Sequence, residues 1–169
     1  MDWRRLANQL EASGRILCDL FAGVDEDQAR RKPAPQRWSM LEVLGHLLDE
    51  EKDDFRRRIS LTLEDPRREW PPIDPEGWAR ERRYNERALA GSLDGFRRER
   101  AASLAWLRGL GEPDWDRGHE HPALGVLRAG DLLASWAAHD LLHVRQLSNL
   151  RPELLSAAAA PYSTRYAMP

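Results

Sequence analysis

Apolar residues recur with helical spacing in four long stretches of this sequence, and almost no segment alternates apolar and polar residues with period two. The segments between these stretches contain prolines or glycines, which interrupt helices. The predicted helices run over about residues 3–22, 39–61, 75–109 and 128–150. The pattern predicts an all-α fold, a four-helix bundle with long loops between the helices.

The start of the second predicted helix carries the clearest local signal in the chain. Ser39 and Glu42 have the spacing of a capping box, in which each side chain satisfies a backbone N–H of the other residue. Trp38 and Val43 occupy the positions of a hydrophobic staple. Glu42 is therefore expected to have a structural role at this helix start.

Three segments are expected to lie outside regular helices. The glycines and serine of AGSLDG, residues 90–95, predict a break within the third helix. Residues 109–125 are rich in glycine, proline and aspartate and are predicted to form a loop. Residues 151–169 are expected to form a partly ordered C-terminal tail of a single domain that spans residues 1–169.

Charge and composition argue against several classes of partner. The 26 basic and 28 acidic side chains give a net charge of −2, which provides no reason to expect nucleic acid or an anionic membrane as a partner. No stretch approaches about 18 apolar residues, and the N-terminal MDWRRLANQL lacks the apolar core of a signal peptide. The single cysteine, Cys18, is predicted to be a small core residue. We therefore expect a soluble, cytoplasmic protein.

Two histidines of the last predicted helix share one face. His139 and His143 are four residues apart, which places their Cβ atoms about 6 Å from each other on a helix. At about 100° per residue they fall within the apolar arc of that helix and point toward the core. Burying two imidazoles costs free energy unless their nitrogens find partners, and one metal ion would serve both rings.

A third histidine could complete a metal site. His46 lies at the flank of the apolar arc of the second predicted helix, where it could face the pair across the bundle. Three neutral imidazoles suit zinc, nickel, copper or ferrous iron, and they leave positions open for water or substrate. The sequence therefore predicts an open metal site held by His46, His139 and His143.

Alternatives to this interpretation stay open. The histidines could be satisfied core residues of a plain bundle, or they could hold a metal in a non-enzymatic, stress-related protein. His119 and His121 form an HxH pair in a predicted loop, but a flexible loop offers no pre-organised third ligand. We predict that this second pair consists of surface or turn residues.

The histidine motifs resemble a known family. The segment WSMLEVLGHLLDEE, residues 38–51, is followed by HDLLHVRQL, residues 139–147. This combination is similar to the motifs W-S-x-x-E-x-x-x-H-L and H-x-x-x-H-x-x-Q of the DinB/YfiT-like superfamily of small bacterial four-helix-bundle proteins. HPALG, residues 121–125, also resembles a segment of that family.

The resemblance implies a fold, a metal and an assembly. By motif match, His46, His139 and His143 would hold a divalent metal, nickel or zinc in the family. The resemblance also implies a frequent tendency to form homodimers. Some members resemble transferases or isomerases that use a low-molecular-weight thiol such as bacillithiol, mycothiol or glutathione, and others are described as metal-dependent hydrolases. Because a divalent cation lowers the pKa of the water or thiol that it binds, both reactions could use one site on a small-molecule substrate.

Several polar residues are candidates for the surroundings of the metal. Gln146 lies on the same stripe as the two histidines of the last helix and could hydrogen-bond a bound ligand or a neighbouring helix. Asp49 and Glu50 could orient the second nitrogen of His46 or act as a base, or they could lie on a solvated face. Asp140 points about 100° away from the ligands and is expected to lie outside the metal site.

The connection between the second and third predicted helices is a candidate cover for the site. It contains Trp70 and Trp78 on either side of several prolines. Loops of this length in a compact domain are often functional. Arg67 and Arg68 in this loop could bind the carboxylate of a thiol cofactor.

Overall fold

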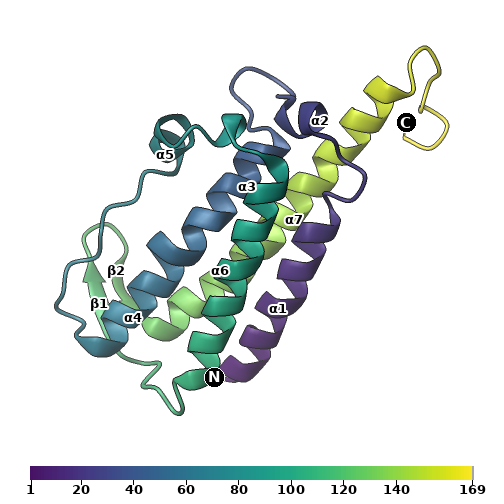
Figure 1. Ribbon diagram of the computed structural model, residues 1–169. Helices are drawn as coiled ribbons and strands as arrows, with labels where there is room; N and C mark the ends of the chain where they lie inside the picture. The colour runs from purple at the N-terminus through teal and green to yellow at the C-terminus, as the bar shows by residue number, and fades with distance from the viewer. Residues whose placement is uncertain (169) are drawn as a thin grey trace.

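The computed structural model describes residues 1–168 and shows a bundle of long helices (Figure 1). The long helices are α1 (Trp3–Asp19), α3 (Met40–Asp49), α4 (Arg56–Glu64), α6 (Leu89–Gly109) and α7 (Ala129–Ala158). A π-helix, η1 (Glu50–Phe55), joins α3 to α4 without interrupting the helical backbone. The prediction of an all-α four-helix bundle is confirmed.

Shorter elements lie in the connections between the long helices. They are α2 (Glu26–Arg30), α5 (Pro75–Glu81), the 3₁₀ helix η2 (Tyr84–Glu86) and the antiparallel strands β1 (Gly118–His121) and β2 (Gly125–Arg128). Within residues 1–168, no helix has the length and the apolar character needed to cross a membrane.

The long helices are threaded as two parallel pairs. Figure 1 shows α1 and α7 running in one direction, with α3, α4 and α6 running in the other. Helix α1 packs against α6 and α7, and α3 packs against α6 and α7. The long helices α4 and α6 follow each other in the chain and are parallel, so they require a long connection, and α5 lies in it.

The predicted helix starts are confirmed by their caps. Ser39 Oγ accepts a hydrogen bond of 3.1 Å from the backbone N–H of Glu42, and the Glu42 carboxylate accepts one of 2.7 Å from the N–H of Ser39. Asp2 caps α1, and Asp74 caps α5 with Pro75 in the first turn. The capping box fixes where α3 begins and thereby the position of every residue along it.

The core consists of two apolar clusters with polar residues between them. Along α7, the first cluster ends at Ala137 and the second includes Val144 and Leu147. The buried polar side chains of His143 and Asp140 lie in the interval. A polar layer therefore crosses the middle of the bundle, and it contains the predicted metal ligands of α7.

The predicted break at residues 90–95 is wrong. The helix is interrupted between Glu81 and Leu89 instead, where Arg83 has a left-handed backbone with φ of 51°. Gly95 lies inside α6 and faces α3, because a Cβ atom at this position would approach Leu48 to 3.2 Å. Its small size thus serves close packing of two helices rather than a break.

The expected tail and loop also differ from the structure. Residues 151–158 continue α7 past Pro152, since the following sequence is rich in glutamate, leucine and alanine, which favour helix. Pro169 lies outside the described residues. Residues 118–125, which lie in the loop predicted over residues 109–125, form a β-hairpin together with residues 126–128. Its strands are too short to show an alternating pattern.

Other boundaries shift slightly. Helix α1 ends at Asp19 rather than about residue 22, and the second predicted helix ends at Glu64 rather than about residue 61. Helix α2 was not predicted, although Asp25 and Gln28 form a capping box at its start.

Candidate metal centre

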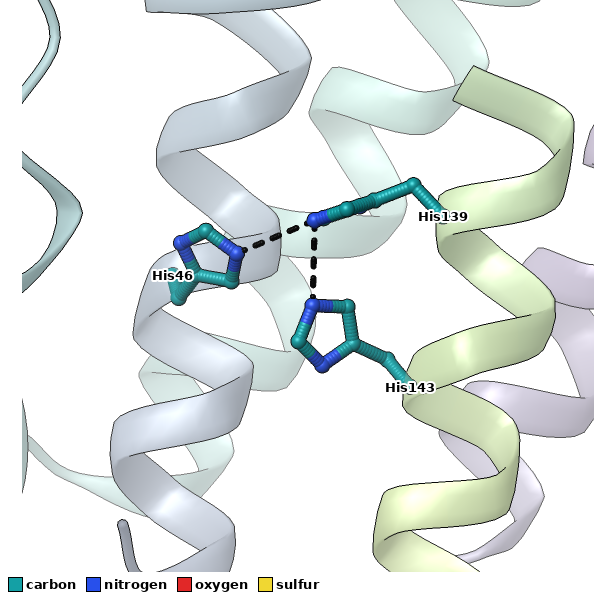
Figure 2. A group of neighbouring side chains, drawn as sticks. All are labelled: His46, His139 and His143. Carbon is teal, nitrogen blue, oxygen red and sulfur yellow. Dashed lines mark hydrogen bonds between the residues drawn. The ribbon is translucent and has the colours of Figure 1, made fainter. Parts of the chain in front are cut away.

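Three histidines from two helices converge inside the bundle (Figure 2). His46 comes from α3, and His139 and His143 come from neighbouring turns of α7. The Nε2 atom of His139 lies 3.2 Å from Nε2 of His46 and 3.1 Å from Nε2 of His143. One ring nitrogen from each residue lies within 4.8 Å of the other two. The three predicted ligands are therefore brought together around one point.

Burial keeps the three imidazoles neutral. Burial, and then the charges of His143 and His139, lower the pKa of His46 to about 2. Burial also lowers the pKa of His139 to about 3, with smaller effects of His143 and Arg100, and burial lowers the pKa of His143. At neutral pH each ring thus has one unprotonated nitrogen, which is the form that binds a metal.

The second nitrogens of two rings face polar side chains. His143 Nδ1 donates a hydrogen bond of 2.7 Å to Gln146 Oε1, which leaves the lone pair of its Nε2 directed into the cluster. His46 Nδ1 lies 3.5 Å from Glu50 Oε1. Burial, and then the charge of Asp54, raise the pKa of Glu50 to about 9, so this carboxyl is protonated at neutral pH.

The donor set fits a divalent metal. Lone pairs on nitrogens 3.1 Å to 3.2 Å apart repel unless a proton or a cation lies between them. Ligand nitrogens bound tetrahedrally to one zinc ion lie about 3.3 Å from each other, which is close to the spacing seen here. Three protein ligands also leave a position for another molecule, as in catalytic sites.

Two of the three histidines border a cavity. His46 and His139 line a cavity of about 620 Å³. The other lining residues come from the segment before α3, from the start of α5 and from α7, and they are Gln36, Arg37, Trp38, Pro75, Glu76, Leu142, Gln146 and Leu150. The cavity therefore has apolar, amide and charged groups of both signs around the histidines.

The structure places Gln146 beside the histidines and Asp140 away from them. Gln146 lines the cavity and accepts a hydrogen bond from His143. It therefore orients one of the predicted metal-binding histidines and, among residues 1–168, does not bond a neighbouring helix. Asp140 points away from the histidines and pairs with Arg100. Asp49 is buried but accepts hydrogen bonds from Tyr84 and Arg82 and not from His46.

The predicted cover reaches the site only at one end. Pro75 and Glu76, which follow the loop, line the cavity. Trp70 instead stacks on His119 of the β-hairpin, with 4.2 Å between ring centroids. Arg67 and Arg68 pair with Asp65 and Glu64 and do not line this cavity.

The second histidine pair is used locally. His119 Nδ1 lies 2.8 Å from the carbonyl oxygen of Pro66, and His121 Nδ1 accepts hydrogen bonds from the backbone N–H groups of Ala123 and Leu124. Among residues 1–168, the group of side chains arranged to hold a metal is His46, His139 and His143.

Two features of the site were missed from the sequence. The ring of Trp38 packs against His46, with 5.0 Å between centroids, and forms part of the cavity wall. The π-helix that follows α3 buries Glu50, Glu51 and Asp54. For Glu50 the sequence left open an orienting role, a role as a base and a solvated face, and the structure buries it. The burial of Glu51 and Asp54 was not predicted.

Comparison with known proteins supports the fold and assigns the family. YfiT from Bacillus subtilis, described as a probable metal-dependent hydrolase with an unusual four-helix bundle topology, is 20% identical with a TM-score of 0.79, over 90% of this chain and 87% of that one. TT2238, a four-helix bundle protein, is 21% identical with a TM-score of 0.62, over 87% of this chain and 98% of that one. No curated protein sequence matches the chain. A model of the DinB superfamily matches residues 9–147, and the chain therefore belongs to the DinB superfamily.

Proposed function

We propose that this protein binds one divalent metal ion through His46, His139 and His143 and acts on a small molecule, as a metal-dependent hydrolase or thiol transferase. The observation that carries the proposal is the convergence of three neutral histidine nitrogens, within 4.8 Å of each other, beside an open cavity. Nickel and zinc are the metals to test first, because three imidazoles suit both.

Each part of the site has a role in this proposal. Gln146 holds a proton on Nδ1 of His143 and so keeps its Nε2 available as a ligand atom. A bound divalent cation would lower the pKa of a water or thiol in its open position, which supplies a nucleophile near neutral pH. Trp38 and Leu142 offer apolar contact to a substrate, and Arg37 offers a positive charge.

The size of the cavity favours a small substrate. Its volume of about 620 Å³ falls within the range of roughly 300–1,000 Å³ that is usual for small-molecule sites. The description of YfiT as a probable metal-dependent hydrolase supports the hydrolase alternative, and we extend that activity to this chain as part of the proposal. Water and a thiol would use the same open position, so the shape of the cavity would decide between the two reactions.

Elemental analysis of the purified protein without an affinity tag tests the proposal directly. We expect about one zinc or nickel ion per chain, and loss of that ion in the His143→Ala variant. The loaded protein is then assayed with small esters and amides, and separately with glutathione, bacillithiol or mycothiol and an electrophile. Protein without metal in both forms would contradict the metal site. Stoichiometric metal that raises Tm without turnover of any substrate would favour a non-enzymatic metal-binding protein.

A further inference from the structure

Polar side chains recur every four residues from His46 in α3 to Arg58 in the first turn of α4. The residues are His46, Glu50, Asp54 and Arg58, and their side chains are 6%, 5%, 8% and 13% exposed. Each lies near the next: His46 Nδ1 is 3.5 Å from Glu50 Oε1, Asp54 is close enough to raise the pKa of Glu50, and Asp54 Oδ1 is 2.8 Å from Arg58 Nε. We call this buried row the polar ladder.

The π-helix explains why the ladder stays on one face. In an α-helix, four residues overshoot one turn by about 40°, so residues four apart drift around the axis. The turns of a π-helix are wider, with hydrogen bonds between residues five apart, and each residue rotates less. The six residues of η1 therefore offset the drift of α3 and α4. Without η1, Arg58 would lie on a different face from His46.

The inner end of the ladder has polar atoms without a hydrogen-bond partner. Within residues 1–168, His46 Nδ1 and Glu50 Oε1 are both buried and neither makes a hydrogen bond. They face each other at 3.5 Å. Since a metal-binding histidine usually donates its other N–H to a carboxyl or carbonyl oxygen, Glu50 is placed to orient His46.

The outer end of the ladder contacts the loop between α4 and α5. Arg58 Nη2 donates a hydrogen bond of 3.2 Å to the carbonyl oxygen of Pro71, and the Arg58 guanidinium lies 4.9 Å from the ring centroid of Trp70. The same loop leads to Pro75 and Glu76, which line the cavity beside the histidines. The ladder thus links the loop to the metal centre through the interior of the helix.

We propose that Glu50 is a positioning residue for His46, and that Asp54 and Arg58 hold Glu50 in place and couple it to the loop of residues 65–74. This inference rests on the proposed function, because it gives Glu50 a part in metal binding. It goes beyond that function by making metal affinity depend on residues that do not touch the metal.

The first test compares two substitutions of Glu50. Glu50→Leu keeps a similar volume but leaves His46 Nδ1 without a partner, and we expect its zinc affinity, measured by competition with a chelator, to fall by about 10- to 100-fold. Glu50→Gln offers an oxygen to His46 and an N–H to Asp54, so we expect it to restore nearly the full affinity. Asp49→Asn is the control for a neighbouring buried carboxylate that does not contact His46. Equal affinities for Glu50→Leu and the wild-type protein would overturn the proposal.

The second test addresses the coupling to the loop. Arg58→Met keeps the aliphatic stem and removes the ion pair with Asp54, and we expect it to weaken zinc binding by about 2- to 30-fold, the range of long-range coupling in proteins. Arg67→Met in the same loop is the matched control, since Arg67 pairs with Asp65 and, within residues 1–168, with no residue of the ladder. Identical affinities for these two variants would refute the coupling of the ladder to the loop.

A measurement on metal-free protein separates this inference from the proposed function. The ¹⁵N shifts of the His46 ring report which nitrogen carries the proton. We expect protonated Nδ1 in the wild-type protein and in Glu50→Gln, and a changed tautomer population in Glu50→Leu. If the protein binds no metal, the proposed function fails, but this measurement still shows whether Glu50 positions the ring of His46. Unchanged His46 shifts in Glu50→Leu would overturn the positioning role.

Discussion

Two buried polar clusters lie in the middle of the bundle, and they differ in how many of their polar atoms have partners. In the first, the guanidinium of Arg100 donates to both carboxylate oxygens of Asp140, to Glu51 and to the carbonyl oxygen of Leu10. Trp136 donates a further hydrogen bond of 3.2 Å to Glu51. Burial alone would lower the pKa of Arg100, but Glu51 and Asp140 raise it. We call these residues the arginine cluster.

The second cluster consists of His46, His139 and His143, and we call it the histidine cluster. Fewer of its polar atoms have hydrogen-bond partners outside the cluster. Its three rings are neutral and direct nitrogens at each other, and Nδ1 of His139 is buried without a hydrogen-bond partner among residues 1–168.

In the arginine cluster Glu51 Oε2 also lacks a hydrogen-bond partner within the described part of the chain, but the other oxygen of that carboxylate is paired with Arg100. Buried polar groups in proteins are nearly always satisfied, so nitrogens of three neutral rings that meet at 3.1 Å to 3.2 Å indicate a missing partner. The arginine cluster therefore stabilises the fold, whereas the histidine cluster is arranged for a ligand.

Removal of Arg100 should have the largest effect on stability. Arg100→Met leaves the carboxylates of Glu51 and Asp140 buried without their counter-charge, and we expect the free energy of unfolding to fall by about 3–5 kcal/mol. Urea denaturation measures this change. Arg98→Met on the exposed face of α6 is the matched control and should change stability by at most about 0.5 kcal/mol.

A triple variant that removes all three charges of the arginine cluster tests whether unpaired charge causes this loss of stability. Adding Glu51→Gln and Asp140→Asn to Arg100→Met should recover part of the lost stability, because no uncompensated charge then stays buried. If Arg100→Met were as stable as the wild-type protein, the arginine cluster would not stabilise the fold, and the contrast with the histidine cluster would be wrong.

The histidine cluster should make the metal-free protein sensitive to acid. The pKa of His139 is about 3 in the folded protein, below its usual value near 6.5, so between these values the unfolded chain binds a proton that the folded chain does not. Stability is complete above about pH 6.5 and is lost as the pH falls. Each such histidine contributes about 1.4 kcal/mol per pH unit.

The contribution of one ring can be isolated from other titrating groups. Glu50 acts in the opposite sense, because its pKa is raised to about 9 and its stabilisation is lost as the pH rises toward that value. We therefore compare slopes in metal-free protein: between pH 6 and 5, His139→Gln should lose stability less steeply than wild type by about 1.4 kcal/mol per pH unit. Equal slopes over this interval would show that His139 is not held neutral by burial. Above pH 7.5 the two slopes should agree, which provides an internal control.

The sequence predicted the histidine cluster better than the arginine cluster. His139 and His143 follow from helical spacing, and the start of α3 at Ser39 fixes His46, so local rules were sufficient to bring the three into one prediction. Arg100 is one of many arginines in the chain, and nothing local distinguishes it from exposed Arg98. Its role depends on contacts with Glu51 and Asp140 from other helices.

In the fold, too, features set by local sequence were predicted and features set by contacts between distant segments were not. Helices with caps and apolar arcs were predicted, while the π-helix, the β-hairpin and the break before α6 were not. The hairpin strand GHEH contains no apolar alternation, and its pairing with residues 125–128 is set by contact rather than by pattern. The π-helix depends on how Glu51 and Phe55 pack against α6 and α7, which a one-dimensional pattern does not contain.

The smallest effect is expected at the second histidine pair, which tests whether incompleteness rather than histidine content marks the metal site. His119→Ala removes the stack on Trp70 and the contact with Pro66, and we expect a loss of about 1 kcal/mol of stability. The double variant His119→Ala and His121→Ala should retain the metal content of the wild-type protein, as measured by elemental analysis, while His143→Ala loses it. The reason is that each ring of the hairpin pair already has partners in the backbone. Loss of metal from the double variant would make the HxH pair part of the binding site. The assignment of the metal to His46, His139 and His143 alone would then be wrong.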